Sequence, residues 1–211
     1  MKNVGVIGLG DMGSGLAKNL IKNGFTVKGA DLLPARQLAF DAMGGLLCSN
    51  PAEVGRDVNA VFVMVMKGSE VKDVIFGSDG LLTTMSTGGA IMLSATIKPN
   101  EAREIGDGMA GSGIHLIDTP VSGGFPGAQS GTLTLMAAAP SATLDEFAPI
   151  MEVVSESIHR VGTNPGDGQT VKACLQSLIG AQFSATFEAA ALAAKAGVPG
   201  QGLLGVFSTS S

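Results

Sequence analysis

Charged and aromatic side chains are scarce in this sequence. Of its 211 residues, 15% are charged and 4% are aromatic, and neither tryptophan nor tyrosine occurs. The formal net charge is −5 and the lysines and arginines are scattered, so the basic stripe typical of a nucleic-acid-binding protein is missing. We therefore expect a small-molecule ligand and no nucleic-acid partner.

Cysteine and histidine are also rare, with two of each: Cys48, Cys174, His115 and His159. The cysteines lie far apart in the sequence, which argues against a disulfide framework and is typical of a reducing compartment. We interpret both cysteines as small core residues. We expect no metal site, because no Cys, Asp or Glu lies at ligand spacing from either histidine.

Long hydrophobic runs are lacking as well. No stretch reaches the roughly 18 uninterrupted apolar residues of a membrane span. The apolar run at the start of the chain is interrupted by Asp11 and by glycines, and no small-residue cleavage site follows it. We expect no membrane association and a cytoplasmic location.

Short apolar segments are what the sequence does contain, and they alternate with helical patterns. The segments that read as strands are residues 4–7, 25–30, 60–65, 90–93 and 114–117, and those that read as helices include residues 16–21, 69–75 and 100–109. Strands that are apolar throughout are buried on both faces, as in a parallel sheet covered by helices. The pattern predicts an α/β fold with a Rossmann-type, mainly parallel sheet. Two further strands are predicted over residues 132–138 and 157–161, with a helix over 142–154 between them.

A long helical stretch follows over residues 168–196, rich in Ala, Leu and Gln. At 1.5 Å per residue it would be about 42 Å long, too long for a Rossmann crossover. We assign residues 1–163 to a dinucleotide-binding domain, and residues 164–211 to a long interdomain helix and the start of an all-α second domain. The apolar circumference of this helix predicts a homodimer or higher homo-oligomer, unless further helices of a longer chain cover it.

A glycine-rich turn joins the first predicted strand to the first predicted helix. It reads Gly8-Leu9-Gly10-Asp11-Met12-Gly13, a GxGxxG pattern in the context of a βαβ unit. Gly8 allows the tight turn, Gly10 lets the backbone approach a pyrophosphate, and Gly13 lets the helix pack closely on the strand. The helix N-terminus offers amides to the same anion. All six residues are therefore candidate cofactor-binding residues.

A carboxylate, Asp31, ends the second predicted strand. At this place a carboxylate can accept hydrogen bonds from the adenosine ribose and would repel a 2′-phosphate, so we expect NAD as cofactor. NADP is the less favoured alternative, which the neighbouring Arg36 keeps open. Asp31 read by itself is also compatible with a simple turn residue at a strand end.

Three segments resemble, in order and spacing, the signatures of the β-hydroxyacid dehydrogenases. They are the glycine turn continued through Ala17, Asn19 and Leu20; the run 118–124 with Ala128 and Gly131; and Gly166-Asp167-Gly168 with Lys172. The run 165–172, together with residues 94–97, is similar to the L-threonate dehydrogenase branch of that family. The resemblance covers nearly the whole chain.

The resemblance implies hydride transfer between a nicotinamide and a small hydroxy acid of the L-threonate or 3-hydroxyisobutyrate kind, with Lys172 as general acid/base. It implies substrate contacts at Ser122, Gly123, Gly124 and Gln176, and further cofactor contacts at Met64, Val65, Met66 and Thr96. The chemistry of the residues agrees, because a Ser-Gly-Gly turn can offer a hydroxyl and two amides to one carboxylate. Read without the resemblance, the two methionines are compatible with core packing, the turn with a flexible loop, and Lys172 with a surface lysine.

Two departures from the family pattern leave a different function open. Leu175 stands where relatives carry Asn, or His in the threonate branch, and it cannot hydrogen-bond a substrate hydroxyl. Relatives also supply a further cofactor-side lysine beyond residue 211. The alternative is a catalytically weak NAD-binding regulatory or assembly module. A third class, a reductase of the 6-phosphogluconate or imine type, is disfavoured by Asp31 and Lys172.

Overall fold

One mixed sheet organises most of the chain. The structure is a computed structural model that describes residues 2–210. Its strands run in the order β3-β2-β1-β4-β5-β6-β8-β7, with β9 paired to β8. They are β1 Asn3–Ile7, β2 Thr26–Ala30, β3 Leu46–Leu47, β4 Ala60–Val63, β5 Ala90–Leu93, β6 His115–Asp118, β7 Val121–Ser122, β8 Leu133–Ala138 and β9 Ser155–Gly162.

The first six strands are all parallel and lie in the order 3-2-1-4-5-6, which is the Rossmann order. The predicted Rossmann-type, mainly parallel sheet is confirmed. The antiparallel pairs are those of β8 with β6 and of β8 with β7, whereas β8 and β9 are parallel to each other. The strand order reverses at β1, which pairs with β2 on one side and β4 on the other.

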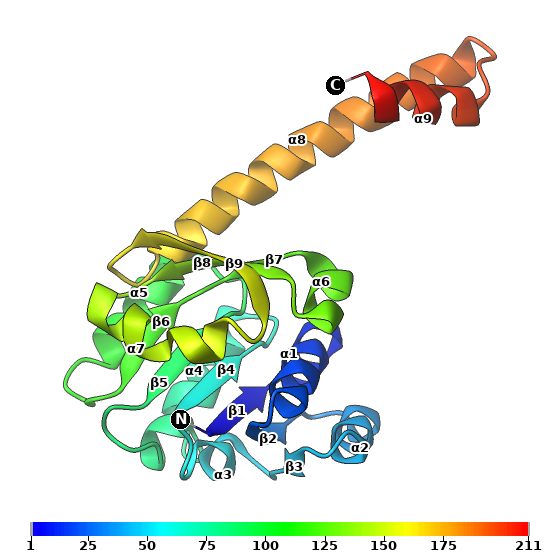
Figure 1. Ribbon diagram of the computed structural model, residues 1–211. Coiled ribbons are helices and arrows are strands. Elements are labelled where there is room, and N and C mark those ends of the chain that lie inside the picture. Colours follow the sequence, from blue (N-terminus) through cyan, green and yellow to red (C-terminus); the bar gives the residue numbers. More distant parts are fainter. Residues whose placement is uncertain (1, 211) are drawn as a thin grey trace. The chain divides into compact units, whose positions relative to one another are not determined.

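Helices cover both faces of this sheet (Figure 1). The helices of the sheet region are α1 Asp11–Lys22, α2 Pro34–Ala42, α3 Pro51–Gly55, α4 Gly68–Phe76, α5 Pro99–Gly108, α6 Gly124–Ser130 and α7 Ser141–Met151, with a short 3-10 helix at Leu81–Thr83. One core includes Leu20 of α1 and Phe147 of α7. The other includes Ile75 of α4 and Ile105 of α5. Burial on both faces explains why β4 and β5 are apolar at every position.

The long elements match the sequence pattern, and the short ones were not predicted. The helices predicted over 69–75, 100–109, 142–154 and 168–196 correspond to α4, α5, α7 and α8, with ends shifted by at most three residues. The strand predicted over 60–65 ends at Val63, which leaves Met64 to Met66 in a loop. No sequence pattern indicates β3 and β7, because two residues are too few to show a period. Also unpredicted were α2, α3, α6 and α9.

The chain divides into two compact units, Met1–Lys172 and Ala173–Ser211. Helix α8, Asp167–Lys195, begins in the first unit and continues into the second, which also holds α9, Gly200–Thr209. The unit boundary lies beyond residue 163, where the sequence suggested a domain boundary, because Gln169 is hydrogen-bonded to Asp118 of β6 at 3.0 Å. None of the helices described combines the length and the apolar character that a membrane span requires.

The prediction that both cysteines are core residues was wrong for Cys174, whereas Cys48 packs, partly buried, against the core that includes Ile75 and Ile105. Cys48 is half-buried beside the two-residue strand β3, and Cys174 is exposed. Cys174 lies on α8, whose buried residues Gly168, Gln169 and Lys172 all precede it. Over residues 2–210, no three His, Cys, Asp or Glu side chains come together as a metal site would require.

Candidate functional site

The glycine turn between β1 and α1 packs against backbone at two of its three glycines. Gly8 has φ +88°, and a Cβ there would overlap the carbonyl oxygen of Met64 after β4. A Cβ at Gly13 would overlap the carbonyl oxygen of Gly8. Gly10 differs: its φ is −67°, and a Cβ would have only the Arg36 guanidinium nearby, at 3.4 Å. The fold itself therefore needs Gly8 and Gly13, while a side chain at Gly10 would meet only the flexible end of Arg36 among its nearest neighbours.

The N-terminus of α1 is available to a ligand. Gly10 is its N-cap, and no side chain caps the amides of the first turn. Free amides at a helix N-terminus beside a glycine turn are what a pyrophosphate binds. Of the predicted turn residues, Leu9 is buried, Met12 is half-buried and Asp11 is exposed. The residues present thus fit the phosphate part of a dinucleotide.

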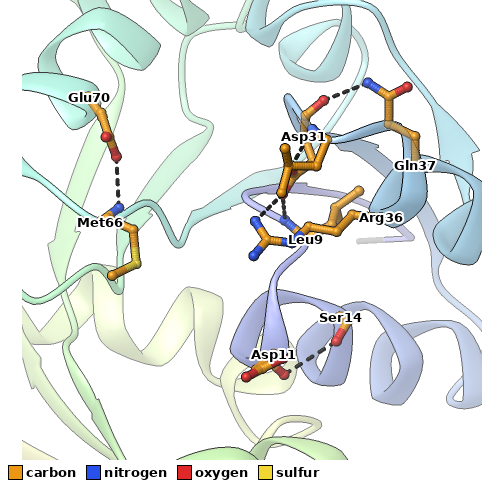
Figure 2. Close-up of polar contacts among 9 residues, drawn as sticks. Leu9, Asp11, Ser14, Asp31, Arg36, Gln37, Met66 and Glu70 are labelled. Carbon is orange, nitrogen blue, oxygen red and sulfur yellow. Dashed lines mark hydrogen bonds and ion pairs between the residues drawn. The ribbon is translucent and has the colours of Figure 1, made fainter.

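Asp31 follows β2 and faces the glycine turn, but its carboxylate already has partners (Figure 2). Its Oδ2 accepts a hydrogen bond from the Leu9 amide at 2.7 Å, and its Oδ1 accepts one from the Leu33 amide at 2.9 Å. Arg36, on α2, lies 3.4 Å from the same Oδ2. A carboxylate has about four acceptor positions, so three donors leave room for one more. A ribose hydroxyl would have to take that position or displace Arg36, the only donor on a flexible side chain.

The remaining residues assigned to the cofactor follow β4 and β5. The segment Met64 to Met66 begins at the carboxyl end of β4, where the Met64 amide donates to Ile7 of β1 at 2.8 Å. Met66 is 83% exposed, and its amide donates to Glu70 of α4 at 2.9 Å. Thr96, after β5, is exposed between two buried residues. The exposure of Met66 disfavours the core-packing interpretation for that residue.

Lys172 is buried in the first unit, with 7% of its surface exposed. Among the described residues, none makes a hydrogen bond or ion pair with its ammonium group. Burial therefore acts alone on this group and lowers the pKa of Lys172. A buried lysine without a partner is unusual, because the charged form loses its hydration. The lowered pKa increases the fraction of neutral amine that can accept a proton at a given pH.

The residues assigned to the substrate lie on two segments. Ser122 ends β7 and is half-buried, while Gly123 and Gly124 are exposed and have φ of +122° and +57°. These glycines start a helix, α6, rather than a flexible loop. Gln176 and Leu175 belong to the second unit, where Gln176 is exposed and Leu175 half-buried. Whether the two segments meet one substrate stays a prediction.

A buried polar cluster at the start of α8 was missed as a site feature. Asp118, at the end of β6, is fully buried, and its Oδ2 accepts hydrogen bonds from the amides of Gly166 (2.8 Å) and Gln169 (3.2 Å). Burial raises the pKa of Asp118, and these hydrogen bonds oppose the increase. The available signal was an acidic residue closing an apolar strand together with a glutamine three positions before Lys172.

Two buried hydroxyls lie at the same edge of the sheet. Ser94 follows β5 and Thr119 follows β6, and they are 1% and 0% exposed. Within the described part of the chain neither oxygen has a hydrogen-bond partner. Unsatisfied buried polar atoms are rare and concentrate at functional sites. The carboxyl ends of β1, β2, β4, β5 and β6 thus carry the candidate groups, as expected for an open parallel sheet.

A Rossmann sheet with a glycine turn and a carboxylate after β2 is typical of a dinucleotide-binding domain. The chain matches, over residues 3–162, the family described as the NAD binding domain of 6-phosphogluconate dehydrogenase. It belongs to the β-hydroxyacid dehydrogenase family, whose NAD-binding domain it contains.

Two relatives are L-threonate dehydrogenases. The chain is 37% identical to that of Escherichia coli O6:H1 over 93% of its own length and 66% of the relative's. It is 35% identical to that of Cupriavidus necator over 100% of its own length and 71% of the relative's. The chain thus spans about two thirds of the length of these relatives.

Solved structures share the fold. A 3-hydroxyisobutyrate dehydrogenase from Salmonella typhimurium has a TM-score of 0.86 at 35% identity, over 94% of this chain and 70% of that one. The Mycobacterium tuberculosis 3-hydroxyisobutyrate dehydrogenase, solved with L-serine, has a TM-score of 0.89 at 29% identity, over 100% and 71%. A protein named Psf3, in complex with NADP+ and 2-OPP, has a TM-score of 0.90 at 24% identity, over 98% and 72%.

The different surroundings of Gly10 and Gly13 predict two different defects. Gly13→Ala should destabilise the first unit, because its Cβ overlaps the Gly8 carbonyl. Gly10→Ala should leave the thermal midpoint within a few degrees and weaken NAD binding roughly tenfold or more, because its Cβ occupies the space above the turn. Calorimetry and a fluorescence titration with NADH measure both quantities. Unchanged NADH affinity in Gly10→Ala would contradict the placement of the pyrophosphate.

Proposed function

We propose that this chain is a NAD-dependent oxidoreductase that transfers a hydride between nicotinamide and a small hydroxy acid. The observation that carries the proposal is Lys172, buried and without a partner in a chain of the β-hydroxyacid dehydrogenase family. The bound nicotinamide supplies the hydride acceptor in oxidation and the hydride donor in reduction. The protein contributes orientation of the substrate and a place for the hydroxyl proton.

Lys172 exchanges the hydroxyl proton in this proposal. In oxidation, the neutral amine of Lys172 accepts the proton from the substrate hydroxyl while the carbinol carbon loses its hydride, and a carbonyl forms. In reduction, the ammonium returns the proton to the oxygen. Burial lowers the pKa of Lys172, which increases the neutral fraction at a given pH and suits the base role.

The proposed substrate is a small hydroxy acid such as L-threonate or 3-hydroxyisobutyrate. Ser122, Gly123 and Gly124 bind its carboxylate through a hydroxyl and two amides, and Gln176 contacts a hydroxyl. The names of the relatives and the retained Ser-Gly-Gly sequence support this assignment. We place the activity in the cytoplasm, which the two free thiols Cys48 and Cys174 favour.

Leu175 supports a second candidate function. Its side chain has no polar atom at a position where the family resemblance implies Asn or His, so one contact to a substrate hydroxyl would be lost. A chain that binds NAD but turns over slowly would act as a regulatory or assembly module. A kcat below that of a Leu175→Asn variant by tenfold or more would favour this alternative.

The cofactor preference follows from the ribose side of the site. We propose NAD over NADP, because Asp31 would repel a 2′-phosphate and Arg36 is held by that carboxylate. Asp31→Ala should bring the dissociation constants for NAD and NADP closer together, because it removes the repulsion of the 2′-phosphate and releases Arg36. Arg36→Gln should weaken NADP more than NAD. Dissociation constants for both cofactors test this, and equal affinities in the unmodified protein would contradict the role of Asp31.

The role of Lys172 predicts a loss of turnover without a loss of cofactor binding. Lys172→Ala should lower kcat for the hydroxy acid by roughly 10²–10⁴ while the affinity for NADH stays within threefold. Lys195→Ala, the exposed lysine at the other end of α8, is the matched control and should behave like the unmodified protein. Joint loss of binding and turnover would indicate a structural role for Lys172.

The same role fixes the sign of the pH dependence. Because oxidation needs the neutral amine, kcat/KM for the alcohol should rise with pH and level off above the lowered pKa of Lys172. Because reduction needs the ammonium, its kcat/KM should fall over the same range. The midpoint should lie below the ordinary lysine value of about 10.4.

The second unit supports a proposal of self-association. Its exposed apolar side chains are Leu178, Phe183, Phe187, Leu192, Val198, Leu204, Val206 and Phe207. Large contiguous apolar surfaces usually mark association sites, and a two-fold homodimer is the simplest closed assembly. We expect a dimer at micromolar concentration by light scattering, and Phe183→Asp with Phe187→Asp should shift it to monomer. A stable monomer of the unmodified chain would contradict this proposal.

A further inference from the structure

The side chain of Gln169 hydrogen-bonds to the segment after β5 and to the residue that ends β6. Its amide nitrogen donates to the carbonyl oxygen of Ala95 and to Oδ1 of Asp118, both at 3.0 Å. Its amide oxygen accepts the hydrogen bond of the Ile97 amide, also at 3.0 Å. Gln169 is 1% exposed. Both N–H donors and the oxygen of this buried amide therefore have a protein partner.

Two of these partners flank Thr96. Ala95 and Ile97 are buried at 2% and 8% exposure, whereas Thr96 between them is exposed. Gln169 thus holds the backbone on both sides of the residue that we assign to the cofactor. A glutamine is suited to this because one planar group carries a donor and an acceptor at fixed separation.

The third partner connects the same glutamine to the start of α8. The Asp118 carboxylate accepts hydrogen bonds from the amides of Gly166 and Gln169, so it lies at the positive end of α8. Gly168 packs without a side chain against the sheet, where a Cβ would lie 2.6 Å from the Met136 carbonyl oxygen. The height and rotation of the first turn of α8 are therefore determined by the sheet.

Lys172 lies three residues after Gln169, on the same face of α8. In an α-helix a side chain leans back over the preceding turn. The side chain of Lys172 therefore extends over the turn that Gln169 and Asp118 hold. Any rotation of that turn would move the amine relative to Thr96.

We propose that Gln169 is a positioning residue that sets the place of Lys172 relative to the Thr96 segment on the cofactor side. It touches neither substrate nor cofactor in this proposal and acts through Lys172. The inference rests on the proposed function, because it gives a reason why the position of the amine matters. A displacement of about 1 Å can cost a hundredfold in rate.

Three variants test the proposal in the full 211-residue chain. Gln169→Met keeps the length and helix propensity but removes all three hydrogen bonds. Gln169→Glu keeps the shape, but it replaces the donor and adds a charge beside Asp118. Gln182→Met is the matched control, since Gln182 is exposed on the same helix and its side chain makes no hydrogen bond among the described residues.

We expect Gln169→Met and Gln169→Glu to lower kcat roughly 10- to 100-fold, with the NADH dissociation constant within threefold of the unmodified protein. Gln182→Met should leave both quantities unchanged. The deciding measurement is the double variant Gln169→Met with Lys172→Ala. If Gln169 acts through Lys172, the double variant should be no slower than Lys172→Ala alone. A further tenfold loss in the double variant would overturn the proposal.

Amide hydrogen exchange gives a readout that needs no turnover. In Gln169→Met, exchange at Ile97 should accelerate at least tenfold because its acceptor is gone, and exchange at Gly166 should also rise. Exchange at Leu9, whose amide is held by Asp31, should stay the same. Unchanged exchange at Ile97 would show that Gln169 does not hold this segment and would refute the proposal.

Different results would contradict the proposed function of Lys172 and the positioning role of Gln169. If Lys172→Ala turns over hydroxy acids as fast as the unmodified protein, the proposed function of Lys172 is wrong and the positioning role falls with it. If Lys172→Ala is inactive and Gln169→Met retains normal kcat, only the positioning role is wrong. If the unmodified chain turns over no hydroxy acid, the proposed function is contradicted, and exchange at Ile97 alone decides whether Gln169 ties the segments.

Discussion

Parallel pairing of β1 with both β2 and β4 is the constraint on which the nucleotide side of the site depends. Ile7 pairs with Ala30 on one side and with Val63 on the other, so the three strands end at the same level. The segments that follow them, with Gly8, Asp31 and Met64, therefore emerge together. Because the strand order reverses at β1, the helices that follow β1 and β4 pack on opposite faces of the sheet, and in open parallel sheets ligands bind at this reversal.

The close approach that this pairing produces explains the two glycines that are structurally required. The carbonyl oxygens of Met64 and Gly8 occupy the places that side chains at positions 8 and 13 would need. Gly10 is different, since its backbone is compatible with any residue and its near neighbour is the flexible end of Arg36. Two of the three glycines in the motif are thus required by packing, and the third, Gly10, is where a ligand would approach.

At the start of α8, a buried carboxylate has the corresponding role. A buried carboxylate without partners would be costly, but Asp118 accepts the amides of Gly166 and Gln169 and the side chain of Gln169. The hydrogen bonds join α8 to β6 and, through Gln169, to the end of β5. Lys172 then lies in the buried part of α8, although no group among residues 2–210 hydrogen-bonds to its ammonium. Burying Lys172 and the unsatisfied hydroxyls of Ser94 and Thr119 costs folding free energy. Such a local cost is typical of functional sites in proteins whose other residues favour the fold.

The sequence by itself determined the Rossmann-type sheet and the long helix α8, because hydrophobic periods and a glycine turn are local signals. It indicated the family through the resemblance of three segments to the family's signatures. It also indicated the candidate residues Asp31 and Lys172. Only the tertiary structure decided which partners surround them: Arg36 and two amides for Asp31, and for Lys172 none within the described part of the chain. It also decided that Cys174 is exposed and that Gln169 reaches Ala95 and Ile97. The physical reason is that burial and hydrogen-bond partners depend on how turns and distant segments come together, up to 72 residues apart for Gln169 and Ile97, and no period in the sequence carries that information.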